Sequence, residues 1–173
     1  MMLFFSLVAN AITKDLENYL SNIQKQEFKI RYTNSKGKHM NGSLSWNKTS
    51  YPFKFIINLG AQKTTIINDH QKIIMHVEQK NSTDRIKAKD ITSNPLASIF
   101  KAKVQFVEHT DSLVQTKSKK LGENRYQVIL YKFTDEACEK EHLILEYEKH
   151  NQKVLLKKWI TVAENRRITI DFL

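Results

Sequence analysis

Apolar and polar residues alternate with a period of two along most of the chain from Glu27 onward. Phe28, Ile30 and Tyr32 alternate with charged neighbours, and the first turn signal, at 34–37, follows directly. This alternation is typical of strands with one buried face. Further runs with this period lie at Leu44 and Trp46, at Phe53, Phe55, Ile57 and Leu59, at Ile73, Met75 and Val77, at Val104 and Phe106, and within 126–133, 143–147, 154–162 and 168–172.

Short polar turns separate these runs, and their length sets the direction of the strands. The turns around Gly60 and at 68–70 contain only a few residues. Parallel strands need a crossover of a dozen residues or more, so short turns favour antiparallel hairpins. The sequence therefore predicts a long antiparallel meander of about ten strands.

Two segments have helical rather than strand spacing. Over 13–24, Thr13 can cap a helix, Asp15 and Glu17 suit its positive N-terminal end, and apolar residues recur on one face. In mid-chain, Asn94 and Pro95 form a helix start before another short apolar face. Both helices need an apolar surface to cover.

A chain of 173 residues can bury one sizeable core, and we predict a single domain over 12–173. Its fold class is mainly β with an α lid: an incomplete antiparallel β-barrel covered by short helices. An uncovered apolar sheet face would cost roughly 25 cal/mol per Å² in water. The two amphipathic helices are the segments that the pattern predicts to cover this face.

The first eleven residues, MMLFFSLVANA, are apolar and end in a small-x-small pattern at Ala9 and Ala11. We interpret 1–11 as a signal-peptide remnant, which predicts export. The alternative is a short N-terminal element packed on the domain.

The chain is basic, with a formal charge of +10, but the lysines are spread along the strands. Such spreading favours a solvated basic face over a nucleic-acid stripe, so no nucleic-acid partner is expected. The single Cys138 can form no internal disulfide, and its place deep in the chain excludes it as a lipid-modified first residue.

The order of these elements resembles the outer-membrane lipoprotein carrier proteins (LolA-like). The motifs that carry the resemblance are a Leu-x-x-Tyr-Leu-x-x-Ile helix from Leu16, a Gly-x-Leu-x-Trp strand from Gly42, a Pro-Phe-Lys-Phe segment from Pro52, a turn at 68–72, the 94–96 helix start and a strand with Trp159. Each motif is weak alone, but together they span about 16–172.

The resemblance implies a periplasmic carrier that binds the acyl chains of lipoproteins in an apolar cavity and transfers them from the inner to the outer membrane. The implied partners are triacylated lipoproteins, an inner-membrane ABC-type release complex and an outer-membrane acceptor, and the carrier itself is expected to be a monomer without enzymatic activity. Each buried CH₂ is worth about 0.8 kcal/mol, so acyl chains leave a membrane only for a comparable apolar cavity.

Strand alternation and helix spacing predict which residues would form that cavity and its lid. The same residues also fit an ordinary filled core. The cavity residues are Phe28, Ile30, Trp46, Phe53, Phe55, Ile57, Ile73 and Met75, and the lid residues are Leu16, Tyr19, Leu20, Ile23, Leu96, Ile99 and Phe100. A carrier has to release its cargo, so we expect an imperfectly packed interior and a lid held by weak contacts.

Many members of the family carry an Arg before the proline that matches Pro52, and the resemblance gives that Arg a latching role on the lid. Here the position is Tyr51, the possible lid latch. A hydroxyl donates one hydrogen bond where a guanidinium donates five, so the latch is expected to be weaker or to lie elsewhere.

No residue pattern predicts catalysis, a metal or a cofactor. His70 with His76, and Cys138 with His142, have poor ligand spacing, and the carboxylates at 135–141 are typical of a solvated loop. The lysines of 117–120 and the arginines of 166–167 fit solvated turns or contacts with an acidic partner. Two alternatives to a carrier therefore stay open: a basic module that binds an anionic membrane surface or an acidic polymer or protein, and a lipoprotein-sensing domain of similar fold.

Overall fold

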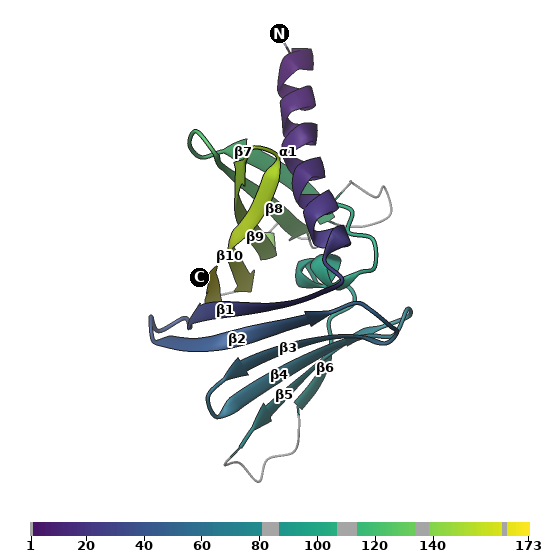
Figure 1. The fold of residues 1–173 in the computed structure, drawn as a ribbon, viewed down its shortest axis with the longest axis vertical. Coiled ribbons are helices and arrows are strands. Elements are labelled where there is room, and N and C mark those ends of the chain that lie inside the picture. The colour runs from purple at the N-terminus through teal and green to yellow at the C-terminus, as the bar shows by residue number, and fades with distance from the viewer. Residues whose placement is uncertain (1, 81–86, 107–113, 134–138, 164–165) are drawn as a thin grey trace.

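The computed structural model describes residues 2–80, 87–106, 114–133, 139–163 and 166–173. Its main element is one antiparallel sheet of eleven strands (Figure 1). The strands are β1 (Lys25–Thr33), β2 (His39–Asn47), β3 (Phe53–Leu59), β4 (Gln62–Asn68), β5 (Ile73–Gln79), β6 (Lys87–Asp90), β7 (Val114–Lys120), β8 (Arg125–Phe133), β9 (Glu139–His150), β10 (Lys153–Ala163) and β11 (Arg166–Phe172).

The sheet is two meanders joined by one pairing. Strands β1 to β6 and strands β7 to β11 each follow the order of the chain, and β1 pairs with β11 where the two meanders meet. Strands β6 and β7 are the two ends of this order, so the sheet stays open. The fold class predicted from the sequence, an incomplete barrel with a helical lid, is confirmed.

The strand registers align the apolar residues of neighbouring strands on one concave face. Trp46 lies opposite Phe55, Phe55 opposite Ile66, and Ile66 opposite Met75, which makes one row across four strands. Because successive strand residues point to opposite faces, this row buries its side chains while neighbours such as Lys54 remain exposed. The two-residue period predicted these strands correctly.

Two glycines explain local features of this half of the sheet. Gly60 has a φ of 62°, a conformation that suits the tight turn between β3 and β4. At Gly42, a Cβ atom would overlap the backbone of Asn58 on the neighbouring strand. The Gly-x-Leu-x-Trp motif therefore begins with a residue that permits close strand approach.

The long helix α1 (Met2–Asn22) packs against β7, β8 and β10, and Figure 1 shows its first turns extending past the sheet. The predicted start at Thr13 is wrong, because the preceding apolar residues continue the helix without a Gly or Pro to interrupt it. The predicted end is correct to within two residues. Whether 1–11 is removed as a signal peptide stays a prediction.

The second cover is the 3-10 helix η1 (Pro95–Phe100), which packs against β8 and β9. The Asn94 side chain accepts a hydrogen bond from the Leu96 N–H at 2.9 Å, so the predicted cap and proline start are confirmed. The predicted strand at Val104 and Phe106 is wrong. Both side chains are buried, but their backbone N–H groups are bonded to α1 side chains instead of to a strand.

Candidate functional site

The predicted cavity residues all lie on the concave face, where the structure brings them together as a core. Ile30, Trp46 and Phe55 have no exposed surface, and Phe28 and Met75 are half-buried against the same cluster. The predicted lid residues Leu16, Leu20 and Ile99 are equally buried and face them. Cavity and lid therefore form one packed interior in this state.

Phe100 of η1 is the centre of that interior. Its ring lies 4.6 Å from that of Phe55, 5.9 Å from Trp46 and 5.6 Å from Trp159, centroid to centroid. These tilted and edge-on geometries are the favoured ones for aromatic pairs. One lid residue thus joins the two meanders through their aromatic side chains.

One polar atom in this interior is left without a partner. The Trp46 Nε1–H is buried and has no acceptor among the described residues. A buried donor without an acceptor costs about 1–3 kcal/mol. The closed packing therefore leaves the Trp46 indole N–H in an unfavourable environment.

Lys48 fastens the end of α1. Its ammonium donates a hydrogen bond to the Leu20 carbonyl at 3.0 Å and lies 5.3 Å from the centre of the Trp46 ring. The last carbonyls of a helix lack helical partners and carry negative partial charge, so a cation suits this position. Only 4% of Lys48 is exposed, and this burial lowers its pKa to about 8.

Tyr51, the predicted latch, lies three residues further along. Its ring stacks on Phe53 and on His70, and the residue is 41% exposed. Lys48 makes the contact with a lid carbonyl that the resemblance assigns to position 51. The sequence signal for Lys48 was its place immediately after a strand, but nothing there indicated that it would be buried.

Two α1 side chains hold the segment that follows η1. Glu17 is 4% exposed and accepts a hydrogen bond from the Phe106 N–H at 2.5 Å, while Ser21 Oγ accepts one from the Val104 N–H at 2.9 Å. The Thr116 hydroxyl on β7 also donates to the Phe106 carbonyl. The two covers are therefore linked to each other as one lid.

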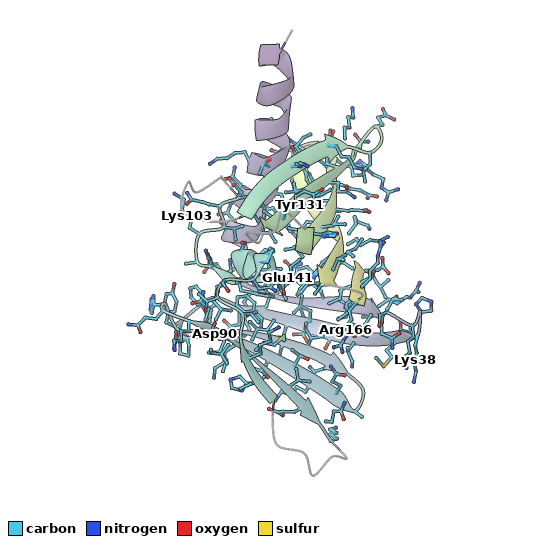
Figure 2. All side chains as sticks on the ribbon, turned by 180° about the vertical axis from the view of Figure 1, so that it is seen from behind. Lys38, Asp90, Lys103, Tyr131, Glu141 and Arg166 are labelled. Atoms are coloured by element: carbon cyan, nitrogen blue, oxygen red, sulfur yellow. The ribbon has the colours of Figure 1, made fainter. Side chains whose placement is uncertain are left out.

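Further polar contacts connect this lid to the sheet. The Tyr147 hydroxyl donates to the Ile12 carbonyl at 2.8 Å, and burial raises the pKa of Tyr147 well above its ordinary value, with Asp15 adding to the shift. The Asn68 amide donates to the Phe100 carbonyl at 2.8 Å. Figure 2 labels Glu141, on β9, whose carboxylate accepts from the Asn94 amide at 3.0 Å beside η1.

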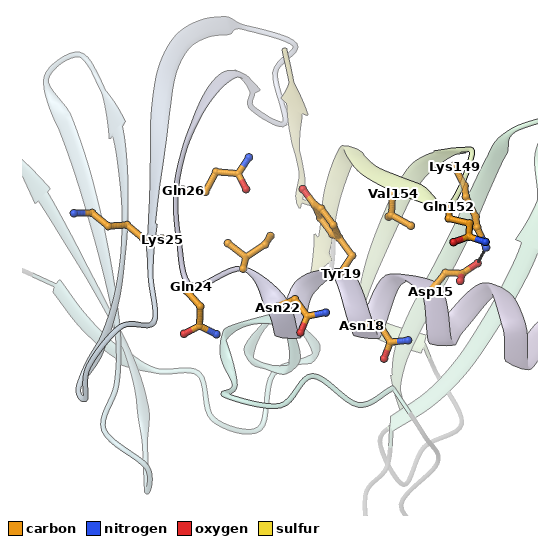
Figure 3. A pocket seen from close by; sticks show the side chains of 11 residues that line it. Asp15, Asn18, Tyr19, Asn22, Gln24, Lys25, Gln26, Lys149, Gln152 and Val154 are labelled. Atoms are coloured by element: carbon orange, nitrogen blue, oxygen red, sulfur yellow. Dashed lines mark hydrogen bonds and ion pairs between the residues drawn. The ribbon is translucent and has the colours of Figure 1, made fainter.

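A groove lies beside the lid, outside the predicted cavity. It has a volume of about 720 Å³ and is lined by α1, the start of β1 and the turn between β9 and β10 (Figure 3). Tyr19 and Ile23 contribute to it from the predicted lid. A second groove of about 620 Å³ lies where the turn between β3 and β4 adjoins the start of β2, at Met40, and the end of β5, at Gln79.

The described residues contain no cluster of three or more His, Cys, Asp or Glu side chains placed to hold a metal, and Cys138 and the pair at 135–136 lie outside them. In the same part of the chain, every helix is too short or too polar to span a bilayer.

Comparison with known proteins adds no family: no family model and no curated protein matches this chain.

Proposed function

We propose that this protein is a periplasmic carrier that binds the acyl chains of lipoproteins between the concave sheet and the lid, and that the structure is its closed, empty state. The observation that carries the proposal is an apolar row, Trp46, Phe55, Ile66 and Met75, on a concave sheet covered by α1 and η1. Lys48 and Asn68 of the N-terminal meander donate hydrogen bonds to carbonyls of these two lid elements. The resemblance to outer-membrane lipoprotein carriers supports the same activity.

Loading requires the lid to leave the sheet, and the lid contacts suit a reversible step. Lys48, Asn68 and Tyr147 each make a single hydrogen bond between the sheet and the lid. Net contributions of about 0.5–3 kcal/mol for each bond are small enough for cargo to replace. Acyl chains would take over the contacts of Phe100, and a carbonyl of the lipid group would supply the acceptor that the Trp46 N–H lacks.

The test uses two substitutions on one strand. Met75→Glu places a charge on the concave face, whereas His76→Glu places the same charge on the opposite face of β5. Delipidated protein mixed with a triacylated lipopeptide should form a soluble one-to-one complex on size-exclusion chromatography. Met75→Glu should lose it, because a buried unpaired carboxylate is unfavourable beside an acyl chain, and His76→Glu should retain it. Absence of a complex with the unsubstituted protein contradicts the proposal.

A basic module that binds anionic surfaces is the second candidate, favoured by the exposed Lys117, Lys119 and Lys120 on the edge strand β7. Binding to anionic vesicles through lysines should weaken steeply between low and high salt. Capture of acyl chains should change little over the same range. A steep loss with salt, without capture of lipopeptide, would favour the second candidate.

A further inference from the structure

Lys48 brings a positive charge into the interior of the domain. Its ammonium lies 5.3 Å from the centre of the Trp46 ring and has three N–H groups, one of which donates to the Leu20 carbonyl at 3.0 Å. Only 4% of the residue is exposed, and its pKa of about 8 keeps it charged at pH 7. A buried charge is unfavourable unless an opposite charge pairs with it.

No such partner for Lys48 lies among the described residues. The ion pairs in this part of the chain join other side chains, and none of them includes Lys48. The last turn of α1 carries no charged side chain, and Glu17, one turn earlier, accepts from the Phe106 N–H. The exposed Lys54 lies opposite Asn47, on the other face of the sheet. The described part of the protein therefore supplies no counter-ion to this cation in the closed state.

The Trp46 indole beside this cation adds a second unsatisfied donor. Its Nε1–H is buried and has no acceptor among the described residues. Both the ammonium and the indole N–H favour the same ligand atom, an oxygen with negative charge. A carboxylate has two such oxygens, so it can accept from both donors at once. The carbonyl of an ester supplies an acceptor but no charge.

The apolar row of the concave face starts at this pair of donors. Trp46, Phe55, Ile66 and Met75 are register partners on β2 to β5. With strands about 4.8 Å apart, the row extends about 14 Å across the face. Phe100 covers its first part, with ring centroids 5.9 Å from Trp46 and 4.6 Å from Phe55. A ligand that displaces Phe100 would therefore meet a cation at one end of a long apolar surface, which matches an amphiphile with an anionic end.

We propose that the interior binds free long-chain fatty acids in addition to the acyl chains of lipoproteins, with the carboxylate held by the Lys48 ammonium and the Trp46 indole N–H. This inference rests on the acyl-chain binding proposed above and extends it to a second class of ligand. When the lid opens, Lys48 loses the Leu20 carbonyl, and the carboxylate replaces that acceptor. A carboxylate suits the site better than a phospholipid headgroup, because Lys48 and Trp46 are almost fully buried and leave little room around their donors.

The test compares myristate with its methyl ester at pH 7, each delivered to the delipidated protein from cyclodextrin and followed by isothermal titration calorimetry. The two ligands share the same chain, but only myristate is charged. Myristate should bind about tenfold more tightly, because hydrogen bonds to a charged group contribute more than neutral ones. Equal affinities overturn the inference and leave the carrier function intact. If neither ligand binds, the inference fails, and the lipopeptide experiment above decides whether the carrier function fails as well.

Two substitutions locate the charge. Lys48→Met removes the ammonium and keeps an unbranched side chain, so the preference for myristate over the ester should disappear. Lys54→Met is the matched control on the opposite face of the sheet and should keep the tenfold preference. Any loosening of the lid by Lys48→Met changes the affinity for both ligands alike, so their ratio isolates the contact with the carboxylate. A preference that survives in Lys48→Met overturns the assignment of Lys48.

A second readout uses the unsubstituted protein and does not depend on the folding of Lys48→Met. The chain has two tryptophans, and the Trp159 Nε1–H already donates to Thr161 Oγ1 at 2.9 Å. In an NMR correlation spectrum of the indole N–H groups, assigned with Trp159→Phe, myristate should move the Trp46 signal further downfield than the methyl ester does, since bonds to charged oxygens are shorter and stronger. The Trp159 signal should respond equally to both ligands. Equal shifts of the Trp46 signal with the two ligands overturn the placement of the carboxylate.

Discussion

The two meanders of the sheet are covered differently. On β7 to β11, α1 lies along the strands, and Val128, Leu130, Leu143 and Leu145 are at most 1% exposed. On β1 to β6, Trp46 and Phe55 are as fully buried, but other concave residues such as Met40 and Met75 are only half-buried. The lid therefore packs mainly on the C-terminal meander, β7 to β11. We expect its contacts with the N-terminal meander, β1 to β6, to break first when the lid opens.

The chemistry of the contacts differs in the same way. Towards β9, α1 is held by the Tyr147 hydrogen bond and by the ion pair of Lys149 with Asp15. Towards β2 to β4, the lid is held by Phe100, by the buried cation of Lys48 and by the Asn68 amide. Substitutions on the two sides should therefore separate the stability of the domain from the closure of the lid.

The largest effect is expected from Phe100→Ala, which empties the centre of the interior. A fully buried Phe→Ala change costs about 3–5 kcal/mol, and urea unfolding followed by tryptophan fluorescence measures it. Phe28→Ala, at a half-buried site beside Phe172, is the control and should cost clearly less. Equal losses would mean that η1 does not join the two meanders.

A pH-dependent effect on the order of 2 kcal/mol is expected from Lys48. Its pKa is about 8 in the folded chain and about 10.4 unfolded, so between these values the unfolded state binds more protons. The free energy of unfolding should therefore rise from about pH 8 to about pH 10.5 relative to Lys48→Met, which has no charge to lose. Urea unfolding of both proteins across this range measures the difference, and parallel curves would contradict the burial of Lys48.

The smallest effect, about 1 kcal/mol, is expected from Tyr147→Phe on the other meander. The substitution removes the hydroxyl that donates to the Ile12 carbonyl and leaves the ring packing in place. Tyr126→Phe, on the ring stacked against Tyr147, is the control and should be nearly neutral. If the affinity for lipopeptide rose more with Tyr147→Phe than with Lys48→Met, the lid would open from the opposite side to that inferred here.

The sheet was predictable because each strand carries its own signal. Phe53, Phe55 and Ile57 alternate within one short run, and burial of one face needs no information from elsewhere in the chain. The lid residues were predictable for the same reason, since Leu16, Leu20 and Ile23 repeat at helical spacing. The spacing of apolar residues does not predict whether the apolar face of the sheet and that of the lid leave a cavity between them.

The lid contacts were not predictable, because charge alone does not indicate burial. In the sequence, Lys48 and Glu17 resemble the many solvated charged residues of this chain. In the fold, Lys48 lies at the end of α1 and Glu17 lies against the Phe106 backbone. The groove beside α1 was equally hidden. Its lining comes from α1, the start of β1 and the turn between β9 and β10, which are distant in sequence.

The open sheet leaves β7 as an outer strand: among the described strands it pairs with β8 alone, and it presents a row of backbone groups on its other side. Such a row can recruit the same strand of another molecule and start aggregation. Here Lys117, Lys119 and Lys120 are exposed along it, so two copies that approached edge to edge would bring like charges together in a region losing its water. The lysines of this strand thus disfavour self-association through β7, and they concentrate positive charge along this edge of the sheet.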